Sequence, residues 1–315
     1  MSLKPDKPPY VPPIEGCEVE RTRHFGPFIT RVDFRLPDGT PYVWTSRRHR
    51  WLGGLQDFPE TRESGVIDAS RWWLEVGVLG RIGWLIAALF MIGSTCFAVA
   101  SAAGLLPDLF GDFGRNATAI NRVFFVGSIF FTLAAWLQLM AAVNADRIAA
   151  IVRRVPPKRK LRWFAWRPSQ IGWLSAFVQF IGVLLFNVNT LDALIAGLDW
   201  LQEDLLIWMP DVIGSICFLV ASSLAMIEYA HAEQGWNPAD VSWWIVSMNL
   251  MGSVAFGVSA AYAVVLPATG ELLDAWMVNV YTCLGAVGFF AGAYLLLPEL
   301  GRNVRRVVHG ESAAG

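Results

Sequence analysis

Charged residues are scarce in this sequence. Asp, Glu, Lys and Arg make up 16% of its 315 residues, whereas a soluble domain usually carries about 25%. The net charge of −1 shows no basic excess, so a nucleic-acid partner is not expected. The scarcity is also uneven: residues 1–83 are relatively polar, and the rest of the chain is a series of apolar runs separated by short polar links.

Cysteine and histidine are also few. None of the four cysteines has a CxxC or zinc-finger spacing, and three of them lie in apolar runs, where they are expected to act as small buried hydrophobes. The sequence has no nucleophile elbow, P-loop, GxGxxG on a strand or HExxH. We therefore expect no metal, no cofactor and no enzymatic activity. The Pro-rich N-terminus lacks an early apolar segment, so no secretory signal peptide is expected.

Long apolar runs are what the sequence does have. A bilayer core of about 30 Å needs roughly 20 apolar residues in a helix. Six stretches of this kind lack charge in their central portions: 84–106, 122–143, 171–191, 211–229, 243–266 and 279–298. They predict an all-α polytopic membrane protein with six transmembrane helices.

The distribution of Lys and Arg predicts the orientation of these helices. Basic residues gather before the first span, between the second and third, and after the sixth, while the alternate links are acidic. By the positive-inside rule both termini should be cytoplasmic, in a bacterial inner membrane. The basic link between the second and third spans would either contact anionic lipids or serve only as the signal that sets the orientation of the protein. Its residues at a lipid surface would be Arg153, Arg154, Lys158, Arg159, Lys160 and Arg162.

A glycine followed four residues later by a phenylalanine occurs in every span. The six copies are GSTCF (93–97), GSIFF (127–131), GVLLF (182–186), GSICF (214–218), GSVAF (252–256) and GAVGF (285–289). A small or polar residue follows three positions after each Phe, so all three residue types lie on one helical face. Small residues let helices approach closely in lipid. The predicted helix-packing residues are Gly93, Gly127, Gly182, Gly214, Gly252 and Gly285.

The spacing of these glycines predicts three copies of one helical hairpin. The hairpins would be residues 84–143, 171–229 and 243–298, followed by a cytoplasmic tail, 299–315. The phrases MIGSTCF, FVGSIFF, VIGSICF and LMGSVAF resemble the YrhK family of small bacterial membrane proteins. The resemblance covers the hairpins only, and Val183 and Ala286 depart from it. It implies a bacterial inner-membrane protein and no particular chemistry.

The N-terminal region, 1–83, is predicted to be cytoplasmic. Alternating apolar residues on either side of the turn PDGT predict a β-hairpin over 28–47. The basic cluster RRHRW at 47–51 would either bind anionic lipid or form a solvated rim. A helix over 68–83 is expected to lie in the membrane interface.

A few polar residues inside the spans are the remaining candidates for chemistry. Gln179, Asn187, Asn189 and Thr190 in the third span predict either a ligand contact or hydrogen bonds between helices. Gln138, Asn249 and Thr282 are expected to be structural. Glu228 and His231 would be either a proton-handling pair or, more simply, a surface pair at a helix end. The link 191–208 either lies on the outer surface or folds back into the bundle.

Three hypotheses for function follow. The first is a non-enzymatic protein for membrane assembly or partner binding, with a protein partner or a second copy. The second is a transporter or channel for a small neutral solute that uses Gln179, Asn187 and Asn189. The third is a lipid-acting enzyme that uses Glu228 and His231.

Overall fold

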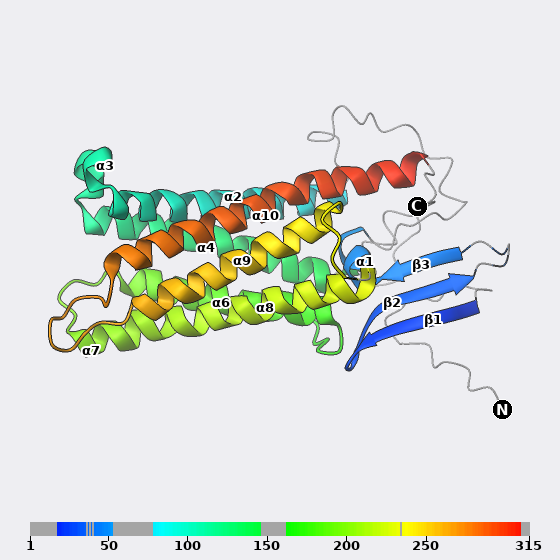
Figure 1. Ribbon diagram of the computed structural model, residues 1–315, viewed down its shortest axis with the longest axis horizontal. Coiled ribbons are helices and arrows are strands. Elements are labelled where there is room, and N and C mark those ends of the chain that lie inside the picture. Colours follow the sequence, from blue (N-terminus) through cyan, green and yellow to red (C-terminus); the bar gives the residue numbers. More distant parts are fainter. Residues whose placement is uncertain are drawn as a thin grey trace.

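The computed structural model is a helical bundle with a small β-sheet at one end (Figure 1). It describes residues 18–35, 37, 39, 41–52, 78–145, 162–233 and 235–309. Six of its helices are long and apolar enough to cross a membrane, which confirms a multi-pass membrane protein. They are α2 (Val78–Leu105), α4 (Ala117–Val143), α6 (Ile171–Asp192), α8 (Met209–Glu233), α9 (Val241–Tyr262) and α10 (Ala275–His309).

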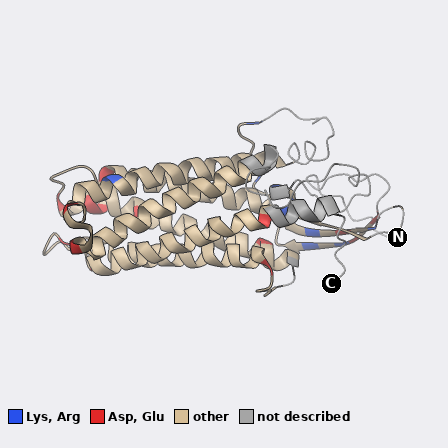
Figure 2. Ribbon diagram, turned by 90° about the horizontal axis from the view of Figure 1, so that it is seen from above, with Lys and Arg blue, Asp and Glu red and all other residues tan. Residues whose placement is uncertain are grey.

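The six helices form a closed ring. Each packs on the next in chain order, and α10 returns to pack on α2. Charged residues lie near the two ends of the bundle, and its long middle portion is almost free of them (Figure 2). We call the end that carries the β-sheet the sheet end, and the opposite end the far end.

Short helices cover part of the far end. They are α3 (Pro107–Gly114), α7 (Trp200–Glu203) and the π-helix η3 (Asp204–Trp208), which runs directly into α8. The indole N–H of Trp208 donates to the carbonyl of Ala260 at 2.9 Å, and the carboxylate of Asp204 accepts from the backbone N–H of Val265 at 2.9 Å. The last part of the 191–208 link is therefore bonded to the end of α9 and the residues after it.

The β-sheet has three antiparallel strands in the order β1 (Glu18–Phe25), β2 (Phe28–Arg35) and β3 (Pro41–Thr45). The predicted β-hairpin is present as β2 and β3, but it ends at Thr45, because Ser46 already begins a helix. The strand β1 was not predicted. Its sequence EVERTRHF has charged residues at half of its positions, so the apolar alternation that marks a half-buried strand is nearly absent.

The short helix α1 (Ser46–Leu52) joins the sheet to the bundle. It contacts β2 and β3 on one side and α4, α6, α8 and α10 on the other. Most of the interfacial helix predicted over 68–83 lies outside the described residues, and from Val78 onward the chain already belongs to α2.

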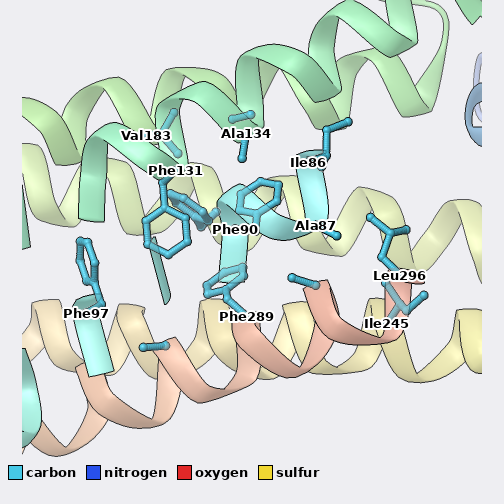
Figure 3. Packing of buried hydrophobic residues seen from close by; sticks show 14 of the residues in the cluster. Ile86, Ala87, Phe90, Phe97, Phe131, Ala134, Val183, Ile245, Phe289 and Leu296 are labelled. Carbon is cyan, nitrogen blue, oxygen red and sulfur yellow. The ribbon is translucent and has the colours of Figure 1, made fainter. Parts of the chain in front are cut away.

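Six phenylalanines fill the centre of the ring. They are the Phe residues of the six sequence motifs: Phe97, Phe131, Phe186, Phe218, Phe256 and Phe289. Each is only 2–5% exposed. Their rings also meet across the ring of helices, with centroids 6.0 Å apart for Phe97 and Phe256 and 5.4 Å for Phe218 and Phe289. Figure 3 shows three of them, Phe97, Phe131 and Phe289, near the axis together with Phe90.

The motif glycines bring helix backbones together beside this layer of rings. A Cβ atom added to Gly93 would lie 3.0 Å from the carbonyl oxygen of Gly127, and one added to Gly252 would lie 3.0 Å from that of Gly285. For Gly182 the corresponding distance to Gly214 is 3.1 Å. Each of the pairs α2–α4, α6–α8 and α9–α10 thus has a glycine-to-glycine contact. That these pairs are copies of one repeat stays a prediction.

Candidate functional site at the sheet end of the bundle

The first anchor of α1 is an ion pair between Arg47 and Glu299 of α10. The Arg47 Nη2 atom lies 3.1 Å from Glu299 Oε1, and the two side chains are 9% and 8% exposed. The hydroxyl of Ser242, in the first turn of α9, donates to the same carboxylate. Glu299 therefore joins α1, α9 and α10.

The second anchor is an ion pair between Arg50 and Glu228 of α8. Arg50 Nη2 lies 2.9 Å from Glu228 Oε2, and the Glu228 side chain is fully buried. The Ser46 hydroxyl donates to Glu228 Oε1 at 2.7 Å, so two residues of α1 that are four positions apart bind this one carboxylate. A buried charge is costly unless it is paired and hydrogen-bonded, and these contacts meet that requirement for the Glu228 carboxylate.

A glycine makes room for the second anchor. A Cβ atom added to Gly172, in the first turn of α6, would lie 1.5 Å from Arg50 Nη1 and 2.9 Å from Glu228 Oε1. The guanidinium of Arg50 thus rests directly on the backbone of α6. Any larger residue at this position would displace Arg50 from Glu228.

A small cavity lies beside this anchor. Its volume is about 30 Å³, and its walls come from the sheet, α1, α4, α6 and α8. The indole N–H of Trp173, a residue that lines the cavity, is buried without a hydrogen-bond partner. A space of this size holds about two water molecules, so the cavity is too small for an organic substrate in this conformation.

The carboxylates also set the charge state of α1. Burial by itself would lower the pKa of Arg47, but the nearby carboxylates of Glu299 and Glu228 outweigh this effect and raise it above its ordinary value. Arg47 therefore remains charged at any physiological pH. Within the described ranges, His, Cys, Asp and Glu form no group of three or more that could hold a metal ion.

The sheet makes a further contact with α8. Arg31 of β2 donates to the carbonyl of Ala232 at 3.1 Å, and the ring of Phe25 packs on that of His231 at 5.0 Å between centroids. The carbonyl of Ala232 lies at the C-terminal end of α8, where cations are favourable. Together with α1, these contacts fix the orientation of the sheet on the bundle.

Two predictions for this region are wrong. Glu228 is neither exposed nor paired with His231, because Arg50 and Ser46 bind its carboxylate inside the protein. In the basic cluster at 47–51, Arg47, His49 and Arg50 form neither a solvated rim nor a lipid-binding surface, since each is 7% exposed. Both errors have one cause: the acidic partners lie at the ends of distant spans, and nothing in the local pattern predicts that the two regions meet.

The structure spreads the predicted ligand residues over several helix contacts. Gln179 accepts a hydrogen bond from Gln138 at 3.2 Å, Asn187 donates to Thr132 at 2.7 Å, and Thr190 donates to Ser128 at 3.0 Å or accepts from it. These three bonds join α6 to α4. Asn189 instead donates to the carbonyl of Ile207 at 3.0 Å, on the η3 side of α6.

The predicted structural residues and lipid-surface residues have different outcomes. Thr282 bonds Ser259 at 2.7 Å across α9 and α10, and Asn249 donates to the carbonyl of Ile245 within α9. Of the predicted lipid-surface residues, only Arg162 is described, and it is exposed. The others, Arg153, Arg154, Lys158, Arg159 and Lys160, lie outside the described residues.

Ser46, Ser242 and Glu299 belong to the site but were not singled out from the sequence. A signal for Glu299 was available, because it is an acidic residue that directly follows the last apolar run. Comparison with known proteins gives no further guidance: no protein-family model, no curated protein and no solved structure matches this chain. The resemblance to the YrhK family therefore stays a prediction.

Proposed function

We propose that this chain is a non-enzymatic protein of a bacterial inner membrane that holds a cytoplasmic β-sheet in a fixed orientation for a protein partner. In this proposal both termini are cytoplasmic, so the sheet end of the bundle faces the cytoplasm. The observation that carries the proposal is the attachment of α1 to the bundle through two buried ion pairs. A tethered domain needs no such fixation unless its orientation matters.

The centre of the bundle supports the same proposal. Six phenylalanine rings occupy the axis, and the polar side chains of α6 are used for bonds to neighbouring helices. Such bonds are a principal source of helix association in lipid, where the hydrophobic effect contributes little. The bundle in this conformation is thus built to be rigid and closed near its middle.

The proposal can be tested by photo-crosslinking in cells. A photoreactive residue at Glu18 or Arg35 of the sheet should give a discrete crosslinked partner, whereas one at Leu109, exposed at the far end, should not. The same product should weaken in the Glu228→Gln variant, because the sheet then loses its fixed orientation. A defined solute flux through the purified protein in liposomes would contradict the proposal.

A second candidate is a transporter or channel for a small neutral solute. The observation that favours it is the position of α1, which contacts four of the six helices at one end of the ring and could close a path as a plug. Single cysteines at Gln179 and Asn187 test this in a variant without the native cysteines. Labelling by an impermeant thiol reagent would favour transport, with Asp199→Cys as the exposed control.

Position 182 is unsuitable for such a probe. A Cβ atom added to Gly182 would lie 3.0 Å from that of Cys217 and 3.1 Å from the carbonyl oxygen of Gly214. A cysteine there would separate α6 from α8 and create the access that the experiment is meant to detect.

A further inference from the structure

Three aromatic side chains are exposed on the irregular segment that precedes α6. Trp163 is 69% exposed, Phe164 58% and Trp166 63%. Exposed aromatic clusters of this kind mark a surface that binds a partner or a membrane. The surroundings of the segment decide which of the two applies.

The segment is held tightly to the end of α4. Asn144, the residue that ends this helix, donates through Nδ2 to the carbonyl of Arg162 at 2.8 Å and accepts from the Arg162 backbone N–H at 3.0 Å. The ring of Trp163 then stacks on Trp136, with centroids 6.0 Å apart and planes 20° from parallel. Trp136 lies about two turns inside α4, so Trp163 reaches back along the side of a membrane-spanning helix.

The next tryptophan contacts the neighbouring span in the same way. The ring of Trp166 packs edge-on against Trp173 and Phe177, with centroids 5.1 and 5.5 Å away. Both partners belong to the first two turns of α6. Two exposed indoles thus lie against the sides of adjacent spans at the sheet end, and tryptophan favours the headgroup level of a bilayer.

Arginines lie at both ends of this aromatic segment. Arg162 is exposed, and within the described residues its guanidinium binds no acceptor. A guanidinium binds phosphate through two parallel hydrogen bonds. We infer that the segment Arg162–Arg167 binds the headgroup of an anionic phospholipid, with Trp163 and Trp166 at the membrane boundary and Arg162 on the phosphate.

The link between α8 and α9 provides an internal comparison. Trp236 is 78% exposed and its ring packs on Trp243, the third residue of α9, with centroids 4.4 Å apart. Residues 234–240, however, include no Lys or Arg. This second aromatic site should therefore contact lipid without selecting an anionic headgroup.

The test uses the full-length protein in detergent, titrated with phosphatidylglycerol or phosphatidylcholine, with bound lipids counted by native mass spectrometry. Arg162→Gln should weaken phosphatidylglycerol binding about fivefold, since a basic residue near an anionic surface contributes about 1 kcal/mol. Its phosphatidylcholine binding should weaken less, because the choline cation beside that phosphate already opposes the guanidinium. Trp163→Ala should weaken the binding of both lipids, because the stacked ring is lost.

The controls are one exposed arginine and one exposed tryptophan elsewhere. Arg115→Gln, at the far end, and Trp236→Ala should both leave the preference for phosphatidylglycerol as in the wild type. Soluble glycerol phosphate should not displace the lipid. The inference is overturned if Arg162→Gln binds phosphatidylglycerol as the wild type does, if Arg115→Gln loses as much, or if glycerol phosphate competes, which would indicate a site for free phosphate.

Discussion

At the middle of the bundle six phenylalanine rings meet without a charge among them, whereas at its sheet end two arginines and two glutamates are buried side by side. The middle is held by close packing, which depends on glycines that let backbones touch. The sheet end is held by paired charges. Once these charges are removed from water, separating them would leave each one buried without a counter-charge, which is costly.

The difference bears on what each region can do. In the close packing of glycine and phenylalanine, each pair of atoms contributes only about 0.1–0.2 kcal/mol, so the stability of the middle is spread over many contacts. A buried ion pair instead has one favourable arrangement, and any displacement leaves charges without partners. Close packing therefore holds the six spans together, while the ion pairs determine where the sheet sits on the bundle.

The largest effect is expected from Glu228→Gln. The change leaves Arg50 buried without its counter-charge, and removing one partner of a buried pair typically costs about 3–5 kcal/mol. We expect α1 to leave the bundle. Spin labels at Arg35→Cys and Trp236→Cys, in a variant without the native cysteines, should give one sharp distance before the change and a broad distribution after it.

A double-mutant cycle separates the pair from its surroundings. The variant with both Arg50→Gln and Glu228→Gln should keep the sheet better placed than either single change, because no charge is left unpaired. The matched control is Asp108→Asn, which breaks the exposed pair with Arg115 and should have no measurable effect. If Arg50→Gln, Glu228→Gln and the double variant all broadened the spin-label distance equally, the pair would not act as a unit.

A smaller effect is expected from Gly252→Ala in the middle of the bundle. The added Cβ atom would lie 3.0 Å from the carbonyl oxygen of Gly285 and 3.1 Å from the ring of Phe289, so α9 and α10 must separate. Overpacking of this kind typically costs about 1–3 kcal/mol. Thermal unfolding in detergent measures it.

The control for this change is Gly257→Ala on the same helix. Its added Cβ atom would meet only the end of the flexible Leu219 side chain, at 3.2 Å, so the midpoint should shift much less. The spin-label distance of the sheet should not change in either variant. Undocking of the sheet in Gly252→Ala would show that the two regions are coupled rather than independent.

A still smaller effect is expected from Asn187→Leu, which removes the hydrogen bond to Thr132. Hydrogen bonds between membrane helices contribute about 0.6 kcal/mol on average. The midpoint of thermal unfolding should therefore fall only slightly. Val188→Ala, at a position 45% exposed on the outer side of α6, serves as the control. A loss of more than about 2 kcal/mol in the free energy of unfolding of Asn187→Leu would indicate a role beyond helix packing.

The same two regions show what the sequence does and does not predict. The spans are evident because an uncharged run of about 20 apolar residues matches the thickness of a bilayer core, and the glycine–phenylalanine motif points to the packing face. The motif does not reveal that all six rings meet at one axis, because that depends on the order of helices around the ring. The ion pairs of α1 are harder still to predict from the sequence, since Arg47 and Glu299 are 252 residues apart.

The smallest expected effect is that of pH on the wild-type protein. Burial lowers the pKa of Arg47, but the carboxylates of Glu299 and Glu228 outweigh this effect and raise the pKa above its ordinary value. A cation with a raised pKa keeps its full contribution to stability below the ordinary value, and loses it only as the pH rises through the raised one. The spin-label distance of the sheet should therefore be the same at pH 7 and pH 10.

Replacing the guanidinium sharpens this last test. In Arg47→Lys the same carboxylates face an ammonium group, whose ordinary pKa is about 10.4. Docking of α1 should then weaken as the pH rises above about 10, while the wild type stays docked. If both proteins lose the sharp distance at the same pH, the positive charge of Arg47 is not what holds α1 to α10, and the Ser242 hydroxyl and the surrounding packing must carry that contact instead.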